Sequence, residues 1–318
     1  MKFPVQISRL DAKLFREISI EQDVSGIGFR FVVPRATSIR KQHTVDKSRS
    51  DISLFELEST GGMRISLSRH HQLREYSASY WHQWELLRQG RSTVKSRECV
   101  TQVGRVSDIL SRKSLDANDY VFRSTVFKNA GIVYFLDVGV PQAEYSGRAA
   151  EILSILSSFE ILSPNNELFA EKMGRFRLAN KPHSFIHPSS WSIESSHGGE
   201  IMILNENKGE KMGAIYLSEG RSESDGLTNH LRHIEQDRVQ LAESNIQLVP
   251  VDSRFDKAYA GNPKAGRDGK HLYIAMLTFQ MRDLQASITL LSPTQTDNLI
   301  WWAINYRAFE IIRDYFEC

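Results

Sequence analysis

The chain has 318 residues, of which 41% are hydrophobic and 25% charged, and its formal net charge is +2. This length and composition predict a globular protein with two ordinary domains. The balance of 40 basic and 38 acidic residues argues against nucleic acid or an anionic membrane as a partner. The opening residues lack a continuous apolar segment, and no stretch approaches the ~18 apolar residues of a membrane span, so we expect a cytoplasmic protein. The two cysteines, Cys99 and Cys318, indicate no disulfide framework.

The first half of the chain predicts strands on either side of one long helix. Alternating apolar and polar residues indicate half-buried strands, and apolar spacings of three and four indicate helices. The expected elements are a Phe-x-x-Pro strand from 31, strands 51–58 and 63–69, a helix over 74–89 with Tyr76, Tyr80, Trp84 and Leu87 on one stripe, strands 120–127 and 131–140 joined by a turn at 128–131, and a closing helix with Ile152, Leu153, Leu156 and Phe159.

The second half predicts the same series of elements. They are a Phe-x-x-Pro strand from 185, strands 200–206 and 213–218, a helix over 227–243, strands 271–281 and 284–291 with a turn at 282–283, and a last helix with Leu299, Trp302, Tyr306 and Phe309. The Gly-, Pro- and charge-rich segment 256–270 is typical of a long, mobile hairpin loop. Between the halves, SPNN at 163–166 is typical of a helix stop.

Short matches between the halves occur in one order along the chain, with an offset between 150 and 159 residues. The matched pairs are Phe31 and Phe185, Val32 and Ile186, Pro34 and Pro188, Ser38-Ile39 and Ser192-Ile193, 65–68 and 215–218, Tyr120-Val121 and Tyr273-Ile274, Pro141 and Pro293, and the helices RAAEIL at 148–153 and RAFEII at 307–312. An ordered series of this kind indicates an internal repeat. We therefore predict two tandem copies of one α+β domain, an antiparallel-sheet α/β sandwich, at 1–163 and 180–318, with a linker at 164–179.

This element order, with a final helix ending in ILSSFEI at 155–161, resembles the PsbP-like α/β/α sandwich. That fold is shared by a photosystem extrinsic protein, a Ran-binding import factor and the Eag-type chaperones of type VI secretion effectors. Eag-type chaperones are single domains that dimerise and hold apolar transmembrane segments against the sheet. The resemblance thus implies a binding scaffold, here a monomer whose second copy acts as an internal pseudo-dimer partner. Immunity proteins of secreted toxins are a second relevant group, because they can be tandem α/β modules that plug an active site.

Motifs for catalysis are absent from the sequence. It contains no GxSxG, HExxH, GxxxxGK[ST] or CxxC, and Gly26-Ile27-Gly28 lacks the third glycine of a dinucleotide loop. The adjacent histidines His70 and His71 would point to opposite faces of a strand. His183, His187, His230 and His233 are the positions to inspect for a metal, but their spacing does not define a ligand set. We expect no cofactor, no metal and no intrinsic turnover.

The expected partner is another protein. If both helices of a domain cover one face of its sheet, the other face is left for docking or for the sister domain. The strands of the first copy offer apolar side chains on both faces, as Val121, Phe127, Ile132, Tyr134 and Leu136 show, and we expect the surface that they form to bind the partner. If the two domains press these faces together, a cleft rim with Trp81 and Trp301 as anchors takes over. The leading hypothesis is an adaptor or chaperone for a secreted effector; the alternatives are a toxin immunity protein and an unrecognised hydrolase or metal enzyme.

Overall fold

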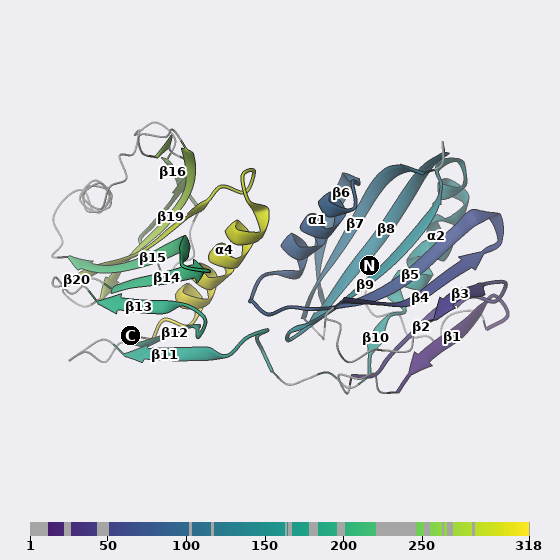
Figure 1. Ribbon diagram of the computed structural model, residues 1–318, viewed down its shortest axis with the longest axis horizontal. Coiled ribbons are helices and arrows are strands. Elements are labelled where there is room, and N and C mark those ends of the chain that lie inside the picture. The colour runs from purple at the N-terminus through teal and green to yellow at the C-terminus, as the bar shows by residue number, and fades with distance from the viewer. Residues whose placement is uncertain are drawn as a thin grey trace. The chain divides into compact units, whose positions relative to one another are not determined.

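The computed structural model describes residues 12–21, 27–42, 51–101, 104–115, 118–162, 164, 167–177, 184–195, 201–220, 246–250, 255–262, 264–265, 270–281 and 284–317. The chain divides into two compact units, Met1–Ala170 and Glu171–Cys318. The division falls inside the expected linker 164–179, although β11 (Met173–Arg177) of unit 2 also lies in that range. Each unit is an α+β structure built on antiparallel strands, as the sequence predicts (Figure 1).

Unit 1 is built on a seven-stranded antiparallel sheet. Its spatial order is β3 (Ser38–Gln42), β4 (Asp51–Ser59), β5 (Met63–His71), β9 (Ile132–Pro141), β8 (Asn118–Asn129), β7 (Gly104–Leu115) and β6 (Ser92–Thr101). In β5 buried residues alternate with more exposed ones, whereas in β9 the residues from Val133 to Val140 are all buried. A strand buried on both faces must lie in the middle of the sheet with layers above and below it.

One face of this sheet carries the main hydrophobic core of unit 1. Helix α2 (Tyr145–Ser157) lies there with a small sheet of β1 (Phe15–Ile20), β2 (Phe29–Pro34) and β10 (Glu160–Ile161). Phe29 of β2 and Phe159 after α2 stack with ring centroids 5.9 Å apart. The Ser158 hydroxyl accepts a hydrogen bond from the Val32 amide at 2.9 Å and so ties the end of α2 to β2. We call this side the core face.

Helix α1 (Ala78–Arg88) lies on the opposite face, over β6, β7 and β8. Ser77 caps it by accepting a hydrogen bond from the Tyr80 amide at 3.3 Å. The expectation that both helices cover one face is therefore wrong. The expected stripe is also wrong, because Leu87 is 65% exposed and the helix buries Trp81, His82 and Glu85 instead. Two of these three residues are polar, so hydrophobic spacing alone selects the wrong side of the helix.

Unit 2 repeats the strand order of unit 1. Its main sheet runs β13 (Ser192–Ser195), β14 (Ile201–Asn207), β15 (Glu210–Gly220), β20 (Leu284–Pro293), β19 (Lys270–Met281), β17 (Lys257–Gly261) and β16 (Ile246–Val249), with β18 (Lys264–Ala265) beside β19. Strands β11 and β12 (Ser184–Pro188) form the small sheet, and helix α4 (Leu299–Asp314) packs on β20, β15 and β12. The expected helix 227–243 lies outside the described residues, as does the turn at 282–283.

The duplication also appears in how each unit ends. In unit 1 the chain after α2 pairs with β2 through β10, and in unit 2 Glu317 after α4 pairs with Ser184 of β12. One match between the two halves of the sequence, Tyr120 with Tyr273, is wrong by one residue. Tyr120 pairs with Pro141, whereas Leu272 rather than Tyr273 pairs with Pro293. A slip of one residue moves a strand's side chains to the opposite face.

The sequence does not predict β6 and β7 of unit 1, because their many polar and charged residues give no clear alternation of apolar and polar positions. It also takes 256–270 for a loop, although β17 and β18 lie within it.

Candidate functional site

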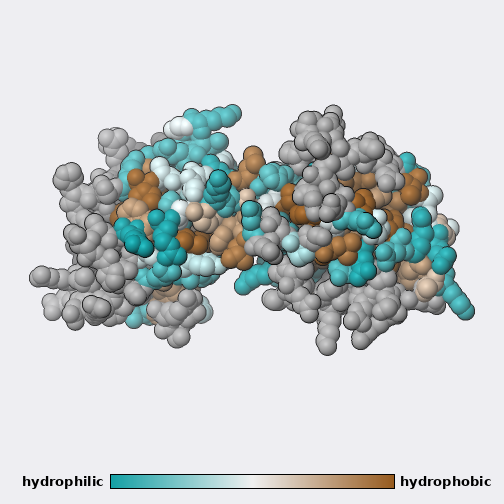
Figure 2. All heavy atoms as spheres, turned by 90° about the horizontal axis from the view of Figure 1, so that it is seen from below, coloured by the Kyte–Doolittle hydropathy of each residue, from teal (hydrophilic) through white to brown (hydrophobic). Residues whose placement is uncertain are grey.

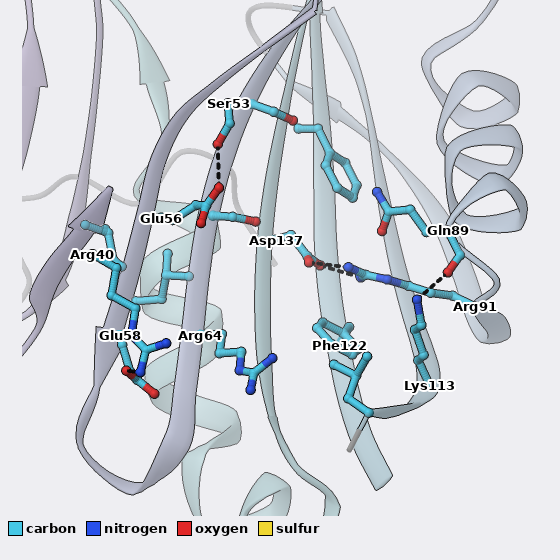
Figure 3. Close-up of a pocket in the computed structure, with 16 residues that line it drawn as sticks. Arg40, Ser53, Glu56, Glu58, Arg64, Gln89, Arg91, Lys113, Phe122 and Asp137 are labelled. Atoms are coloured by element: carbon cyan, nitrogen blue, oxygen red, sulfur yellow. Dashed lines mark hydrogen bonds and ion pairs between the residues drawn. The ribbon is translucent and has the colours of Figure 1, made fainter. Parts of the chain in front are cut away.

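A hollow of about 510 Å3 lies on the face of the unit 1 sheet opposite the core face (Figure 3). Strands β3, β4, β5, β9, β8 and β7 and the chain that follows α1 all contribute to it. The lining residues are Arg40, Ser53, Glu56, Leu57, Glu58, Arg64, Ile65, Ser66, Ser68, Gln89, Arg91, Lys113, Leu115, Phe122, Phe135 and Asp137. Most of their side chains are polar or charged.

The hollow exists because α1 covers only part of this face. The helix contacts β6, β7 and β8, and its last turn leads into Gln89 and Arg91 at one side of the hollow. Beyond it, β5 directs Ser66 and Ser68 to this face and Ile65 and Leu67 to the core. The alternation of a half-buried strand therefore produces a small, polar floor here.

Ion pairs connect most of the charged groups that line the hollow. Arg91 donates two hydrogen bonds to Asp137, at 2.9 and 2.7 Å, and the two side chains are only 9% and 5% exposed. Arg40 pairs with Glu58 at the other side. Figure 3 shows both pairs, together with the hydrogen bond from Ser53 to Glu56. A buried, bidentate pair of this kind holds its strand and loop in one geometry.

Phe122 forms a rigid part of the floor. The guanidinium carbon of Arg91 lies 3.9 Å from the centre of its ring. On the neighbouring strand Gly139 leaves room for that ring, since a Cβ there would lie 2.3 Å from a ring carbon. Phe122 is 5% exposed, so it supports the hollow more than it contacts solvent.

The same face of unit 2 has a different composition. The strand registers make Arg64 equivalent to Ala214, Ser66 to Tyr216, Asp137 to Thr289, Gly139 to Leu291 and Phe122 to Ile274. Ile274 and Leu291 are buried in an apolar cluster against which Tyr216 packs. Because one fold carries both compositions, the fold itself does not require the polar hollow of unit 1.

The residues expected to form an open apolar face are instead inside unit 1. Tyr134 and Leu136 are 0% exposed, and Phe127 and Val121 are 3% and 4% exposed. Tyr134, Leu136 and Phe127 belong to the core under α2 and β2, and Ile132 packs against it half-buried. The strand register places these residues on one face of the sheet, and the expectation of an open face fails because α2 and the small sheet cover that face.

The two expected tryptophan anchors differ in exposure. Trp81 is 3% exposed and packs edge-on against Phe135, with ring centroids 6.0 Å apart, so it is a core residue of unit 1. Trp301 lies in the first turn of α4 and is partly exposed. A role for Trp301 in binding stays a prediction.

Beneath α1 lies a polar cluster that no pattern in the sequence predicts. His82 Nδ1 lies 3.0 Å from Ser107 Oγ, and its Nε2 lies 2.7 Å from Ser124 Oγ. Burial is the main cause that lowers the pKa of His82 to about 3, and the charge of Arg91 acts in the same direction, while Asp108 opposes it. A histidine beside serines is a pattern of nucleophilic catalysis, but all three side chains are at most 2% exposed. The cluster therefore joins α1 to β7 and β8.

A smaller cavity of about 230 Å3 lies between Lys95, Arg97, Asp108, Leu110, Arg123 and Tyr145. Arg123 and Arg97 both donate to Asp108. Burial raises the pKa of Asp108, but the hydrogen bonds and charges of Arg123 and Arg97 outweigh it and hold the pKa below its usual value. The carboxylate is thus already bound by the chain's own cations.

No group of three or more His, Cys, Asp or Glu in the described ranges is arranged to hold a metal ion. His187 is buried and lies 3.0 Å from the Pro188 carbonyl oxygen, whereas His183, His230 and His233 lie outside the described residues. Among the helices that the structure describes, none has the length and apolar character needed to cross a bilayer.

Large exposed hydrophobic residues in the described part of the chain are scattered. They include Leu73, Leu87, Leu168 and Leu248. Figure 2 shows hydrophobic and hydrophilic residues interspersed on the visible face. Isolated hydrophobic residues of this kind are ordinary on protein surfaces.

No protein-family model and no curated protein sequence matches this chain. Among solved structures, PsbP (CyanoP) from Synechocystis sp. PCC 6803 shares 10% identity over 48% of this chain and 95% of its own, with a TM-score of 0.38. Immunity protein TplEi of the type VI secretion system of Pseudomonas aeruginosa, complexed with "L" peptide, shares 11% identity over 94% of this chain and 98% of its own, with a TM-score of 0.22. These are weak likenesses of fold, too low to assign a family.

Proposed function

We propose that this chain is a non-enzymatic protein-binding module of the toxin-immunity kind, and that the hollow of unit 1 is its contact site. The observation that carries the proposal is the polar, preorganised hollow at a position where the sister unit has buried apolar residues. A charged surface that the fold does not need is typical of a site kept for recognition. Ion pairs that fix its walls in advance lower the entropic cost of binding.

The same observation argues against a chaperone for transmembrane segments. Such a segment needs apolar surface, and the apolar residues expected to supply it, Tyr134 and Leu136 among them, are buried. The open surface carries Glu56, Arg64 and Ser66 instead, and placing apolar residues against unsatisfied charges costs free energy. A folded, polar protein such as a secreted toxin fits this surface better.

The test is to co-express the chain with the protein encoded beside its gene and to measure growth and complex formation by size-exclusion chromatography. We expect a complex that restores growth. The variant Ser66→Tyr introduces the residue that unit 2 carries at the equivalent position, filling the hollow without changing its charge, and should abolish the complex. The matched control is Ser146→Tyr, on an exposed position of α2. If Ser66→Tyr protects growth as well as Ser146→Tyr does, the hollow is not the contact site.

A chaperone role is tested separately with a 20-residue leucine–alanine peptide flanked by lysines, a length that matches about one membrane span. We expect no saturable binding to the purified chain by fluorescence anisotropy. Saturable binding of this peptide would restore the chaperone hypothesis in place of the immunity role.

A further inference from the structure

Charge in the hollow of unit 1 is not evenly matched. Its lining residues include four cations and three carboxylates, which are Arg40, Arg64, Arg91 and Lys113, and Glu56, Glu58 and Asp137. The pairs Arg40–Glu58 and Arg91–Asp137 are internal. Two cations, Arg64 and Lys113, and one carboxylate, Glu56, are left over.

Neither remaining cation has a carboxylate partner among the described residues. The guanidinium carbon of Arg64 lies 5.0 Å from the centre of the Tyr120 ring, and Lys113 donates a 2.7 Å hydrogen bond to the Gln89 carbonyl oxygen. An aromatic ring and a carbonyl orient a cation but do not neutralise it. Arg64 is exposed and Lys113 is half-buried, so both can meet a ligand in the hollow.

The strand order and register set the distance between the backbones of Arg64 and Lys113. Arg64 is on β5 and Lys113 on β7, with β9 and β8 between them. Neighbouring strands are about 4.8 Å apart, which separates the two backbones by roughly 14 Å across the sheet. The row of Arg64 meets β7 at Ser111, two residues from Lys113, so the offset along the strands increases this separation to roughly 16 Å. An extended peptide rises about 3.4 Å per residue, so acidic side chains about four to five residues apart would match this separation.

We propose that the hollow receives an extended acidic segment of the partner protein, with one carboxylate bound by Arg64 and a second by Lys113. This proposal rests on the proposed function, and it states which kind of partner segment, an acidic and extended one, binds at the same site. Glu56, at the β4 side, disfavours an acidic group beyond Arg64 and so limits where the segment lies. Arg91, held by Asp137 over Phe122, keeps the floor between the two carboxylates in place.

The probe is a fluorescein-labelled octaglutamate peptide, measured by fluorescence anisotropy with the full chain. We expect saturable binding that weakens strongly between about 0.1 M and about 1 M salt, where the Debye length falls from roughly 10 to roughly 3 Å. Arg64→Glu and Lys113→Glu should each weaken it about tenfold or more, because attraction becomes repulsion. The control Arg112→Glu reverses an exposed cation next to Lys113 on the opposite face of β7 and should change affinity by less than about twofold. Melting temperatures verify that each variant is folded.

Octalysine and octaglutamine peptides should not bind. An eight-nucleotide oligothymidylate that binds more tightly than octaglutamate and responds to the same variants would overturn the proposal in favour of nucleic acid. If octaglutamate does not bind but Ser66→Tyr still abolishes the complex with the protein partner, the acidic segment is wrong and the proposed function stands. If Ser66→Tyr leaves that complex intact, the contact site itself is wrong.

Discussion

Protonation of His82 should contribute to the destabilisation of unit 1 by acid. The structure holds its imidazole neutral between two serines, with a pKa of about 3, whereas an unfolded chain has the ordinary value of 6.5. Because the folded pKa is the lower one, the unfolded state binds a proton first as the pH falls. The stabilisation is complete above pH 6.5 and is lost progressively toward pH 3.

The magnitude follows from these two pKa values. Each unit of difference is worth about 1.4 kcal/mol, so the full difference corresponds to about 5 kcal/mol, and about 3 kcal/mol of it is lost between pH 7 and pH 4. The matched variant is His82→Gln, whose amide can still reach a serine but does not titrate. It should be less stable than the wild type at pH 7, and its stability should depend less steeply on pH.

The assay is urea unfolding at several pH values between 7 and 4, followed by circular dichroism, with separate transitions fitted for the two units. The transition that His82→Gln shifts identifies unit 1. Asp108, whose pKa is also lowered, contributes an acid-dependent loss to both proteins and cancels in the comparison. If wild type and variant lose stability in parallel across this pH range, His82 is not the buried neutral group described above.

Three further substitutions test the packing of unit 1 by urea unfolding. Asp137→Asn leaves Arg91 buried without its charge partner and should cost about 3–5 kcal/mol; a loss below about 1 kcal/mol would mean that the pair is solvated. Gly139→Ala places a Cβ against the Phe122 ring and should cost about 1–3 kcal/mol, while unchanged stability would show that the ring can move freely. Tyr134→Asp buries a charge in the core and should unfold unit 1, whereas the control Leu87→Asp on an exposed position should stay within about 0.5 kcal/mol; a folded Tyr134→Asp protein would contradict the assigned core.

The sequence predicted the architecture because repeated segments and strand alternation can be recognised without knowing any tertiary contact. The Phe-x-x-Pro strands, the 63–69 strand and the two closing helices are where the pattern places them. Hydrophobic spacing fails where polar side chains are buried in pairs. Helix α1 buries His82 and Glu85, and Leu87 of the expected stripe is exposed. The partners that make such burial possible, Ser107 and Ser124 for His82, are distant in sequence.

The candidate site was missed for the same reason. Arg64, Asp137 and Lys113 come from three strands, and one of these strands, β7, has no clear alternation. β9 is apolar on both faces, so its sequence does not show which face a helix covers or that Tyr134 and Leu136 are buried. Only the register of β5, β9 and β8 brings Arg64 beside Gly139 and Phe122.

Each unit returns at its end to the strand near which it began, through β10 on β2 and through Glu317 on Ser184. A domain whose beginning and end are neighbours can be copied, appended or removed with few broken contacts. In such a module one continuous stretch of chain supplies the strands and helices that cover its core. One duplicated chain can therefore carry a charged face on one copy and an apolar face on the other, on the same scaffold.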